Sequence, residues 1–288
     1  MAGQCQNLVK ARDFSTQPGC FSRQRILVTG AAGRIGTLVS SYLANQFSLV
    51  LSDRRPLPKD IGLPFARCEL TDQDTLIDCC HGIDVVLHLG AISEPTAGWQ
   101  EILPGNIIGV HNLFQSACEA GCSRVIYASS MMTVDAYPKD ITVETTMPVK
   151  PSTLYGVSKV WGETLGNYYA EQRGLSVICL RLGWVVRRRD YRLVPGNSSL
   201  GFALTEGDLL RLLTAALLAP AEIKYGIFHG ISNNKWKRLS IENTCRMLGY
   251  SPHDDAYQLA RTNYGAIFWH KIKRLRHILR RYFSRNTG

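Results

Sequence analysis

The chain has 288 residues, of which 45% are hydrophobic and 19% are charged, a composition typical of a globular protein with a core of its own. No apolar run reaches the roughly 18 residues that a membrane-spanning helix requires. The net charge is +10, but eight lysines and arginines and no acid follow Asp255, so residues 1–255 carry only +2. A nearly neutral body with one basic end does not suggest a nucleic-acid-binding protein.

The cysteines indicate the compartment. There are nine, an odd number, scattered through expected strands and helices, and Cys118 and Cys122 share a helix face. No second cysteine or histidine pair at ligand spacing accompanies these two, so we expect no metal site. Reduced thiols of this kind are typical of a cytoplasmic protein.

The first 24 residues show little periodicity and include several glycines, prolines and polar residues. We expect a flexible N-terminal extension over residues 1–24. Lys10, Arg12 and Arg23, set against the single acid Asp13, leave a mitochondrial presequence as an alternative.

Strands and helices are expected to alternate from residue 25 onward. Such alternation predicts an α/β fold, a Rossmann-type doubly wound parallel sheet with helices on both faces. Shorter elements near the end predict a small C-terminal substrate lobe within the same domain, residues 25–263. The expected strands cover residues 25–29, 48–52, 85–89, 124–128, 176–181 and 226–230. One helix is expected to follow the first strand and to end near residue 45, and the other helices are expected over residues 106–120, 155–173, 206–218 and 240–248. A further helix is expected to open near Glu69–Asp72, with Thr71 as its N-cap.

A glycine-rich turn follows the first expected strand, with the spacing G-x-x-G-x-x-G. A strand, a glycine turn and a helix place backbone N–H groups and a helix N-terminus where a pyrophosphate binds. We therefore expect a dinucleotide to contact Gly30, Gly33, Arg34, Ile35 and Gly36. A tight turn between strand and helix, without a ligand, is the alternative.

Asp53 follows the second expected strand, about 20 residues beyond the glycine turn. A carboxylate at this place accepts hydrogen bonds from the adenosine ribose and repels a 2′-phosphate, which favours NAD. Arg54 and Arg55 stand beside it and leave NADP as the less favoured cofactor.

The strand at residues 85–89 leads into a turn of small residues. We expect Leu89, Gly90 and Ala91 to lie under the cofactor and Ser93 to face the substrate. His88 invites a catalytic role, but a histidine within an apolar strand is more often a buried, hydrogen-bonded residue of the core.

Tyr155 and Lys159 stand four residues apart at the start of the expected long helix. Side chains at this spacing lie one turn apart on the same face, so the ammonium group approaches the phenol. A neighbouring cation lowers the pKa of a tyrosine from about 10, and a phenolate takes protons from hydroxyl groups. The alternative is that Tyr155 and Lys159 are exposed on the helix surface and have no catalytic role. The glycine turn upstream and the serine pair Ser129-Ser130 at a strand end favour catalysis.

Two basic segments remain. Arg187, Arg188, Arg189 and Arg192 lie in a loop after the strand at 176–181, where one of them can clamp an anionic group and the others are solvated. In the basic tail, residues 264–288, apolar residues recur at helical spacing, which predicts an amphipathic helix. This helix could bind an anionic membrane surface or an acidic partner, or it could pack on the body of the protein or across a dimer. Its apolar positions are Phe268, Ile272, Leu275, Leu279, Tyr282 and Phe283.

The sequence resembles the extended short-chain dehydrogenase/reductase family, also called the NAD-dependent epimerase/dehydratase family, from about Ile26 to Ala256. Within that family it is most similar to the uronate dehydrogenases, which oxidise galacturonate or glucuronate at C1 with NAD. The matching motifs are the glycine turn, Asp53, His88-Leu-Gly90, Gly105-Asn106-Ile-Ile-Gly109, Ser129-Ser130, Tyr155-x-x-x-Lys159, Arg181-Leu-Gly183, Asp190-Tyr-Arg192 and Leu248-Gly-Tyr-x-Pro252.

The resemblance implies roles for these residues. Tyr155 would take the hydroxyl proton, while Lys159 would lower its pKa and bind the nicotinamide ribose. Ser130 would bind the reacting oxygen with help from Thr133, and Arg192 would hold the anionic end of a small sugar. The resemblance also makes Asn106 a cofactor contact, and it implies a homodimer through the helices that contain Asn106 and Tyr155.

Two departures from the uronate dehydrogenase pattern concern the sugar. Met131 and Met132 replace an asparagine and a histidine after the serine pair, and methionine makes no comparable hydrogen bonds to hydroxyl groups. Trp184 replaces a small polar residue after Gly183. The alternatives are therefore a nucleotide-sugar epimerase or dehydratase, another sugar reductase, or an NAD(P)-binding scaffold protein that has lost turnover.

Overall fold

The computed structural model describes residues 22–188, 190–263, 265 and 268. Seven parallel strands form a central sheet in the order β3-β2-β1-β4-β5-β6-β9. The chain moves outward from β1 to β3, then crosses back to β4 and continues in the opposite direction, which confirms the expected doubly wound Rossmann-type sheet. The strands are β1 (Ser22–Thr29), β2 (Phe47–Asp53), β3 (Phe65–Arg67), β4 (Val85–His88), β5 (Arg124–Ser130), β6 (Ser176–Leu182) and β9 (Tyr225–Gly230).

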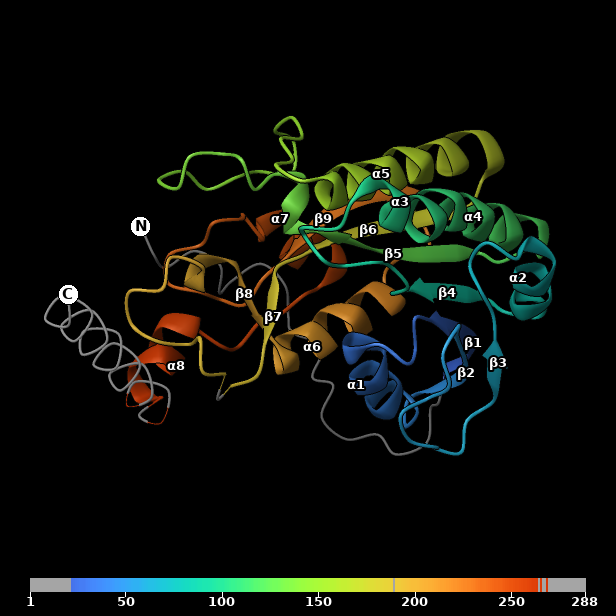
Figure 1. The fold of residues 1–288 in the computed structure, drawn as a ribbon, viewed down its shortest axis with the longest axis horizontal. Helices are drawn as coiled ribbons and strands as arrows, with labels where there is room; N and C mark the ends of the chain where they lie inside the picture. The colour runs from blue at the N-terminus through green and yellow to red at the C-terminus, as the bar shows by residue number, and fades with distance from the viewer. Residues whose placement is uncertain (1–21, 189, 264, 266–267, 269–288) are drawn as a thin grey trace, which may run out of the picture.

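Helices cover both faces of this sheet (Figure 1). Successive side chains of a strand point to opposite faces, so Ile26 and Val28 pack toward α1 (Arg34–Leu43) and α6 (Glu206–Leu217). Leu27 packs on the other face, with side chains of α2 (Gln73–Cys80), α4 (Gly109–Glu119) and α5 (Leu154–Arg173). The apolar runs of the central strands are long because both faces are buried.

The helix expected over residues 106–120 is interrupted. A short α3 (Trp99–Ile102) runs into the π-helix η1 (Leu103–Ile108), and α4 begins only at Gly109. Pro104 stands near the start of η1 and has no N–H group to donate along a helix, while its carbonyl accepts from the Gly109 N–H. This wider turn contains Asn106.

The C-terminal part adds a second, two-stranded parallel sheet of β7 (Trp184–Val186) and β8 (Ala203–Thr205). The other elements here are η3 (Leu200–Phe202), α7 (Glu242–Leu248) and α8 (Ala256–Thr262). α8 packs through Ala256 and Ala260 against Val186 and Leu193. The domain boundaries remain a prediction, because residues 1–21 and nearly all of the basic tail lie outside the described residues.

Three local expectations differ from the structure. The N-cap of α2 is Asp72, whose carboxylate accepts from the Thr75 N–H, instead of Thr71. Strand β3 was not expected, because its three residues are too few to show an alternating pattern. β1 begins at Ser22, within the segment expected to be flexible. No helix among the described residues combines the length and the apolar character needed to cross a bilayer.

Candidate active site

The glycine turn after β1 packs against the loop after β4. Gly30 has φ +71°, and a Cβ added to it would lie 2.6 Å from the backbone N of Gly90. A Cβ on Gly36 would collide with the Gly30 carbonyl, so α1 packs directly on the turn. Gly33 is the N-cap of α1 and no side chain caps it, so N–H groups of the first turn can donate to an anion. These features fit the phosphates of a dinucleotide.

Asp53 is the last residue of β2 and is held beside this turn. Its Oδ2 accepts from the Ala32 N–H at 3.0 Å, and its Oδ1 accepts from the Arg55 N–H at 2.9 Å. The Arg55 Nε also lies 3.6 Å from Oδ1, although the Arg55 side chain is mostly exposed. The structure thus brings the expected ribose-binding acid next to the expected phosphate cradle.

Asn106 fixes the loop after β4. Its Oδ1 accepts from the Ile92 N–H at 2.8 Å, and its Nδ2 donates to the Ile92 carbonyl at 2.9 Å and to the Ser158 Oγ at 3.0 Å. These contacts tie the loop that contains Leu89, Gly90 and Ala91 to α5. Ser93 stands exposed farther along this loop. Asn106 is 1% exposed, and its expected contact with the cofactor stays a prediction.

Tyr155 lies in the first turn of α5, which is capped by Thr153 accepting from the Gly156 N–H. The phenol lies near Ser130, at the carboxyl end of β5, and the Ser130 hydroxyl acts to lower the pKa of the phenol. A Cβ on Gly156 would collide with the Met132 carbonyl, so α5 begins in close contact with the segment after β5. This contact places Tyr155 beside Ser130.

Lys159 lies one helical turn later and is 3% exposed. Its Nζ donates to the Ala128 carbonyl at 2.8 Å and lies 5.7 Å from the centroid of the Tyr155 ring. Burial lowers the pKa of Lys159 to about 8, against the opposing charge of Glu163. The expected pair is therefore present on one buried face of the helix.

The pKa of Tyr155 differs from the expectation. Burial raises the pKa of the phenol above its usual value, and the hydrogen bond with Ser130 works in the opposite direction. We expected Lys159 to lower the pKa of Tyr155 below its usual value, and this expectation is wrong. The phenol loses most of its solvent, and this loss has a larger effect on the pKa than the other contributions.

A buried ion pair lies beneath Lys159, and we did not anticipate its role. Arg181 donates to both oxygens of Glu163 at 2.8 Å, and Ser129 donates to Glu163 Oε1 at 2.6 Å. Arg181 is 1% exposed and Glu163 is 3% exposed. An acid four residues after Lys159 and an arginine inside an apolar strand were the signal for such a pair.

Two other polar residues, His88 and Thr133, are buried and hydrogen-bonded within the chain. His88 is wholly buried, its Nδ1 hydrogen-bonds with Thr29 Oγ1 at 2.7 Å, and its ring stacks on Tyr127. Burial, helped by the charge of Lys159, lowers the pKa of His88 to about 3, so the ring is neutral. Thr133 is also fully buried and donates to the Ser130 carbonyl at 2.9 Å. Both contacts place these side chains in the core.

Apolar side chains surround the other side of Tyr155. Met132 packs in one cluster with Tyr155, Ala97 and Ile102, and Met131 packs in a neighbouring cluster. The Met132 N–H donates to Ser130 Oγ at 3.2 Å. Met132 is therefore the methionine of the two that packs with Tyr155.

The described arginines of the loop after β7 are paired. Arg187 contacts Glu206 and Arg188 contacts Asp254. Arg192 donates from Nε and Nη2 to the two oxygens of Asp190, each at 2.9 Å, which helps to hold the pKa of Asp190 below its usual range. Arg189 lies outside the described residues.

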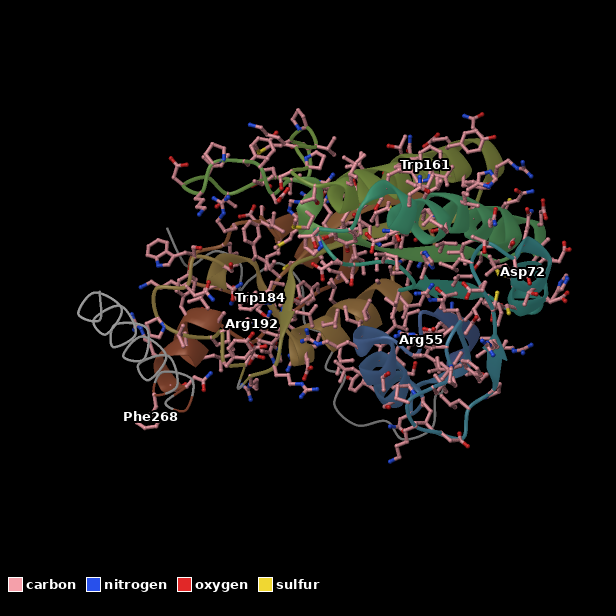
Figure 2. All side chains as sticks on the ribbon, in the orientation of Figure 1. Arg55, Asp72, Trp161, Trp184, Arg192 and Phe268 are labelled. Carbon is pink, nitrogen blue, oxygen red and sulfur yellow. The ribbon has the colours of Figure 1, made fainter. Side chains whose placement is uncertain are left out.

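Arg192 also stacks on Trp184. The guanidinium lies 4.5 Å from the centroid of the indole ring, and Figure 2 shows the two residues side by side. Arg34, from the glycine turn, donates to the Val185 carbonyl at 2.9 Å. This bond joins the cofactor side of the site to β7, the strand that contains Trp184.

The geometry brings together a phosphate cradle, a ribose-binding acid and a phenol with serine and lysine neighbours. All lie at the carboxyl edge of a doubly wound sheet, where ligands bind in such folds. Ile35 packs partly into the core behind the turn. Within the described residues, no three His, Cys, Asp or Glu side chains are grouped to hold a metal ion.

Comparison with known proteins agrees with this arrangement. L-arabinose 1-dehydrogenase (NAD(P)(+)) of Haloferax volcanii is 30% identical over 81% of this chain and 97% of its own length. Uronate dehydrogenase of Agrobacterium fabrum is 32% identical over 81% of this chain and 86% of its own length. A mutant uronate dehydrogenase from Agrobacterium tumefaciens, solved in complex with NAD, superimposes with a TM-score of 0.76 at 30% identity and covers 85% of this chain and 90% of that one.

A family model covers the residues that build the site. The model of the NAD dependent epimerase/dehydratase family matches residues 26–195, from β1 to the loop that contains Arg192. The matched segment includes the glycine turn, Asp53, Ser130 and the Tyr155–Lys159 pair. The chain therefore belongs to the NAD dependent epimerase/dehydratase family.

Proposed function

We propose that the protein is an NAD-dependent dehydrogenase that oxidises a hydroxyl-bearing carbon, the hemiacetal carbon, of a small anionic sugar. The observation that carries this proposal is the place of Tyr155, next to Ser130 and one helical turn from Lys159, at the same sheet edge as the glycine cradle. The uronate dehydrogenases and the arabinose dehydrogenase among the relatives support the reaction class.

The cofactor site fits NAD through residues of this chain. The turn at Gly30–Gly36 would hold the pyrophosphate, Asp53 the adenosine ribose, and Lys159 the nicotinamide ribose, above the floor formed by Leu89, Gly90 and Ala91. When bound, NAD supplies the acceptor for the hydride. Asp53 disfavours NADP because its carboxylate repels a 2′-phosphate.

Tyr155 would act as the general base. Ser130 would donate to the reacting oxygen, and Tyr155 would accept the hydroxyl proton of the substrate. Ser130 favours the phenolate, whereas burial opposes it and has the larger effect, so the pKa of the phenol lies above its usual value. We therefore expect turnover to increase toward alkaline pH. Glu163 and Arg181 would act beneath Lys159 as positioning residues.

Arg192 would orient the anionic end of the substrate. The Arg34 bond joins the glycine turn to β7, the strand that precedes the loop with Arg192, so a sugar between Tyr155 and this loop would be bound close to the cofactor. Trp184 holds the guanidinium plane by stacking. A nucleotide-sugar substrate is less well supported, since the named relatives act on small sugars or sugar acids.

The test is a substrate panel. Purified protein would be mixed with NAD and galacturonate, glucuronate, L-arabinose, glucose or UDP-glucose, and the absorbance of reduced cofactor followed. Turnover on a uronate supports the proposal. Turnover on neutral aldoses alone would contradict the proposal that the substrate is anionic. Turnover on UDP-glucose alone would favour the nucleotide-sugar alternative. Tight NAD binding without turnover on any sugar would favour a scaffold protein.

We also propose a homodimer. Large apolar side chains are exposed along one side of α5, at Leu154, Val157, Trp161 and Tyr168, and Ile108 of η1 is exposed as well. A second copy of this chain would cover such a stripe. Light scattering should give the mass of a dimer for the protein and of a monomer for Trp161→Glu.

The basic tail and the compartment are the remaining proposals. Contact of residues 264–288 with an anionic membrane or an acidic partner rests on the sequence alone, and binding to anionic vesicles that survives removal of these residues would contradict it. A cytoplasmic location is supported by the cysteines, because all seven in the described residues are free thiols.

A further inference from the structure

Lys159 and Glu163 lie one turn apart on the buried face of α5, which packs over β5 and β6 (Figure 1). The two side chains reach neighbouring residues of β5. The Lys159 Nζ donates to the carbonyl of Ala128 at 2.8 Å, and Glu163 Oε1 accepts from the hydroxyl of Ser129 at 2.6 Å. The ammonium and the carboxylate are therefore neighbours in the protein interior.

The carboxylate of Glu163 is bonded to Arg181 of β6. Arg181 donates from Nε to Oε1 and from Nη2 to Oε2, each at 2.8 Å. A bidentate pair of this kind is among the strongest that side chains form, and both partners are almost wholly buried. The ammonium of Lys159, which at its spacing could pair with Glu163, is bonded to a backbone carbonyl instead. Arg181 thus takes the place that Lys159 would otherwise occupy on the carboxylate.

The contact between α5 and the sheet leaves these groups little room to move. A Cβ added to Gly162 would lie 2.3 Å from the ring of Tyr127, and one added to Gly166 would lie 2.8 Å from Val177. The helix and the sheet therefore touch directly on this face. The ammonium of Lys159 lies 4.9 Å from the centroid of the Tyr127 ring. A change of charge at such a place acts strongly on neighbouring charges, because little solvent screens them.

The other ionisable groups that face this region are uncharged near neutral pH. Burial lowers the pKa of His88 on β4 to about 3 and that of His229 on β9 to about 4. Burial also raises the pKa of the acidic groups here, which are Tyr127, Tyr155, Cys179 and Tyr225. The charges that act on one another in this region are therefore those of Lys159, Glu163 and Arg181.

We propose that Glu163 and Arg181 act together as positioning residues for Lys159. Glu163 holds the ammonium in its charged form within the protein interior. Arg181 occupies the carboxylate, so that Glu163 does not draw the ammonium away from Tyr155 and the nicotinamide ribose. The contribution of Lys159 to turnover rests on the proposed function, but the effect of the pair on the charge of Lys159 does not.

The direction of each effect follows from the charges. Burial lowers the pKa of Lys159 to about 8, and the charge of Glu163 opposes this fall. Without the carboxylate, Arg181 would be a second unpaired cation beside the ammonium, and the pKa of Lys159 would fall further. Without the arginine, the carboxylate would pair with Lys159, and the pKa of Lys159 would rise. Removal of either partner of one ion pair therefore has opposite effects on a third group.

Nuclear magnetic resonance tests these effects without cofactor or substrate. The full-length protein would contain isotope-labelled lysine, and the Cε signal of Lys159, assigned with Lys159→Met, would be followed from pH 6 to pH 10. Glu163→Gln should lower the midpoint of this titration by about one pH unit or more, and Arg181→Met should raise it. Shifts in the same direction, or a midpoint that neither variant moves, would overturn the proposal.

A double variant addresses the stability of the fold. Breaking a buried ion pair destabilises a protein, whereas removal of both charges is often tolerated. In Glu163→Gln/Arg181→Met the midpoint of Lys159 should lie below that of the unmodified protein, because Glu163 is the charge that supports the ammonium. An unchanged midpoint would overturn the proposal even if neither single variant folds.

A control variant removes a buried carboxylate elsewhere. Asp208 accepts from Arg211 at 2.8 Å in α6, the helix that packs on the opposite face of the sheet. Asp208→Asn should leave the midpoint of Lys159 unchanged. A shift as large as that in Glu163→Gln would contradict a specific role of Glu163.

Initial rates with NAD and a uronate test the consequence for turnover. A neutral Lys159 has lost its charge and one donor, so the deficit of Glu163→Gln against the unmodified protein should grow to about tenfold from pH 6 to pH 9, the equivalent of one pH unit in the titration. The deficit of Arg181→Met should not grow with pH. A deficit of Glu163→Gln that is the same at every pH would contradict the proposal. If the unmodified protein turns over no sugar, the proposed function is contradicted, and the titration still decides the role of the pair.

Discussion

The guanidinium of Arg192 stacks 4.5 Å from the centroid of the Trp184 ring while it donates two hydrogen bonds to Asp190. Stacking and the carboxylate together fix the plane of the guanidinium, so its direction is set before a substrate arrives. A tryptophan at this position therefore supports the proposed anion site through its contact with the arginine.

Arg192→Lys should impair the use of anionic sugars. Lysine keeps the charge but loses the planar fork and the stacking surface. We expect the KM for a uronate to rise by about tenfold to a hundredfold, the equivalent of one or two charged hydrogen bonds. The KM for a neutral aldose should change little. Arg188→Lys, at an exposed arginine paired with Asp254, is the control, and an equal effect of both variants on uronate kinetics would contradict the assignment.

Gly30→Ala should abolish NAD binding and destabilise the fold. The added Cβ meets the Gly90 backbone at 2.6 Å in addition to the strain of positive φ. Gly121→Ala is a matched control, because Gly121 has φ +75° and nothing within 4 Å of the added atom. The control should lose about 1–2 kcal/mol of unfolding free energy, and Gly30→Ala about 1–3 kcal/mol more. Equal losses in urea unfolding would show that the close contact is absent.

Asp53→Asn should shift the cofactor preference. The amide oxygen can still accept from a backbone N–H, but the charge that repels a 2′-phosphate is gone, and Arg55 lies nearby. We expect the ratio of kcat/KM for NAD to that for NADP to fall by about tenfold or more, the equivalent of about 1.4 kcal/mol. Asp60→Asn in the exposed loop after β2 is the control. An unchanged ratio would remove Asp53 from cofactor selection.

The buried His88 should make the fold sensitive to acid. The pKa of His88 is about 3 in the folded chain, below its ordinary value of 6.5. Between these values the unfolded chain binds a proton that the folded chain does not, so the unfolding free energy falls as the pH falls. His88→Asn removes this titration.

The measurement is urea unfolding at pH 6.5 and at pH 5. The unmodified protein should lose about 2 kcal/mol more than His88→Asn over this interval, at about 1.4 kcal/mol for each pH unit. An equal loss in both proteins would mean that His88 is protonated without cost in the folded state.

Much of this fold was predictable because its signals are local. Strands buried on both faces read as short apolar runs, and the glycine turn needs a specific residue type at Gly30, where φ is positive. The Tyr155 and Lys159 side chains share a helix face at any i, i+4 spacing, so their proximity follows from the sequence as well.

The parts that were missed depend on packing. The π-helix arises at Pro104, and a sequence pattern does not show whether a proline ends a helix or widens it. The pairing of Arg192 with Asp190 depends on a loop conformation, although only two residues separate them. The direction of the pKa shift of Tyr155 depends on how deeply the phenol is buried, which spacing alone does not reveal.

The most direct test of the account is the turnover of Tyr155→Phe. Tyr155 is 8% exposed and packs against Ala97 and Ile102, and phenylalanine keeps that packing while it removes the proton acceptor. Tyr168→Phe, at an exposed tyrosine of the same helix, is the control. Initial rates with NAD and a uronate should fall by about a hundredfold to ten-thousandfold in Tyr155→Phe, with NAD affinity unchanged and the control at full rate. A Tyr155→Phe protein that turns over like the unmodified one would contradict the account.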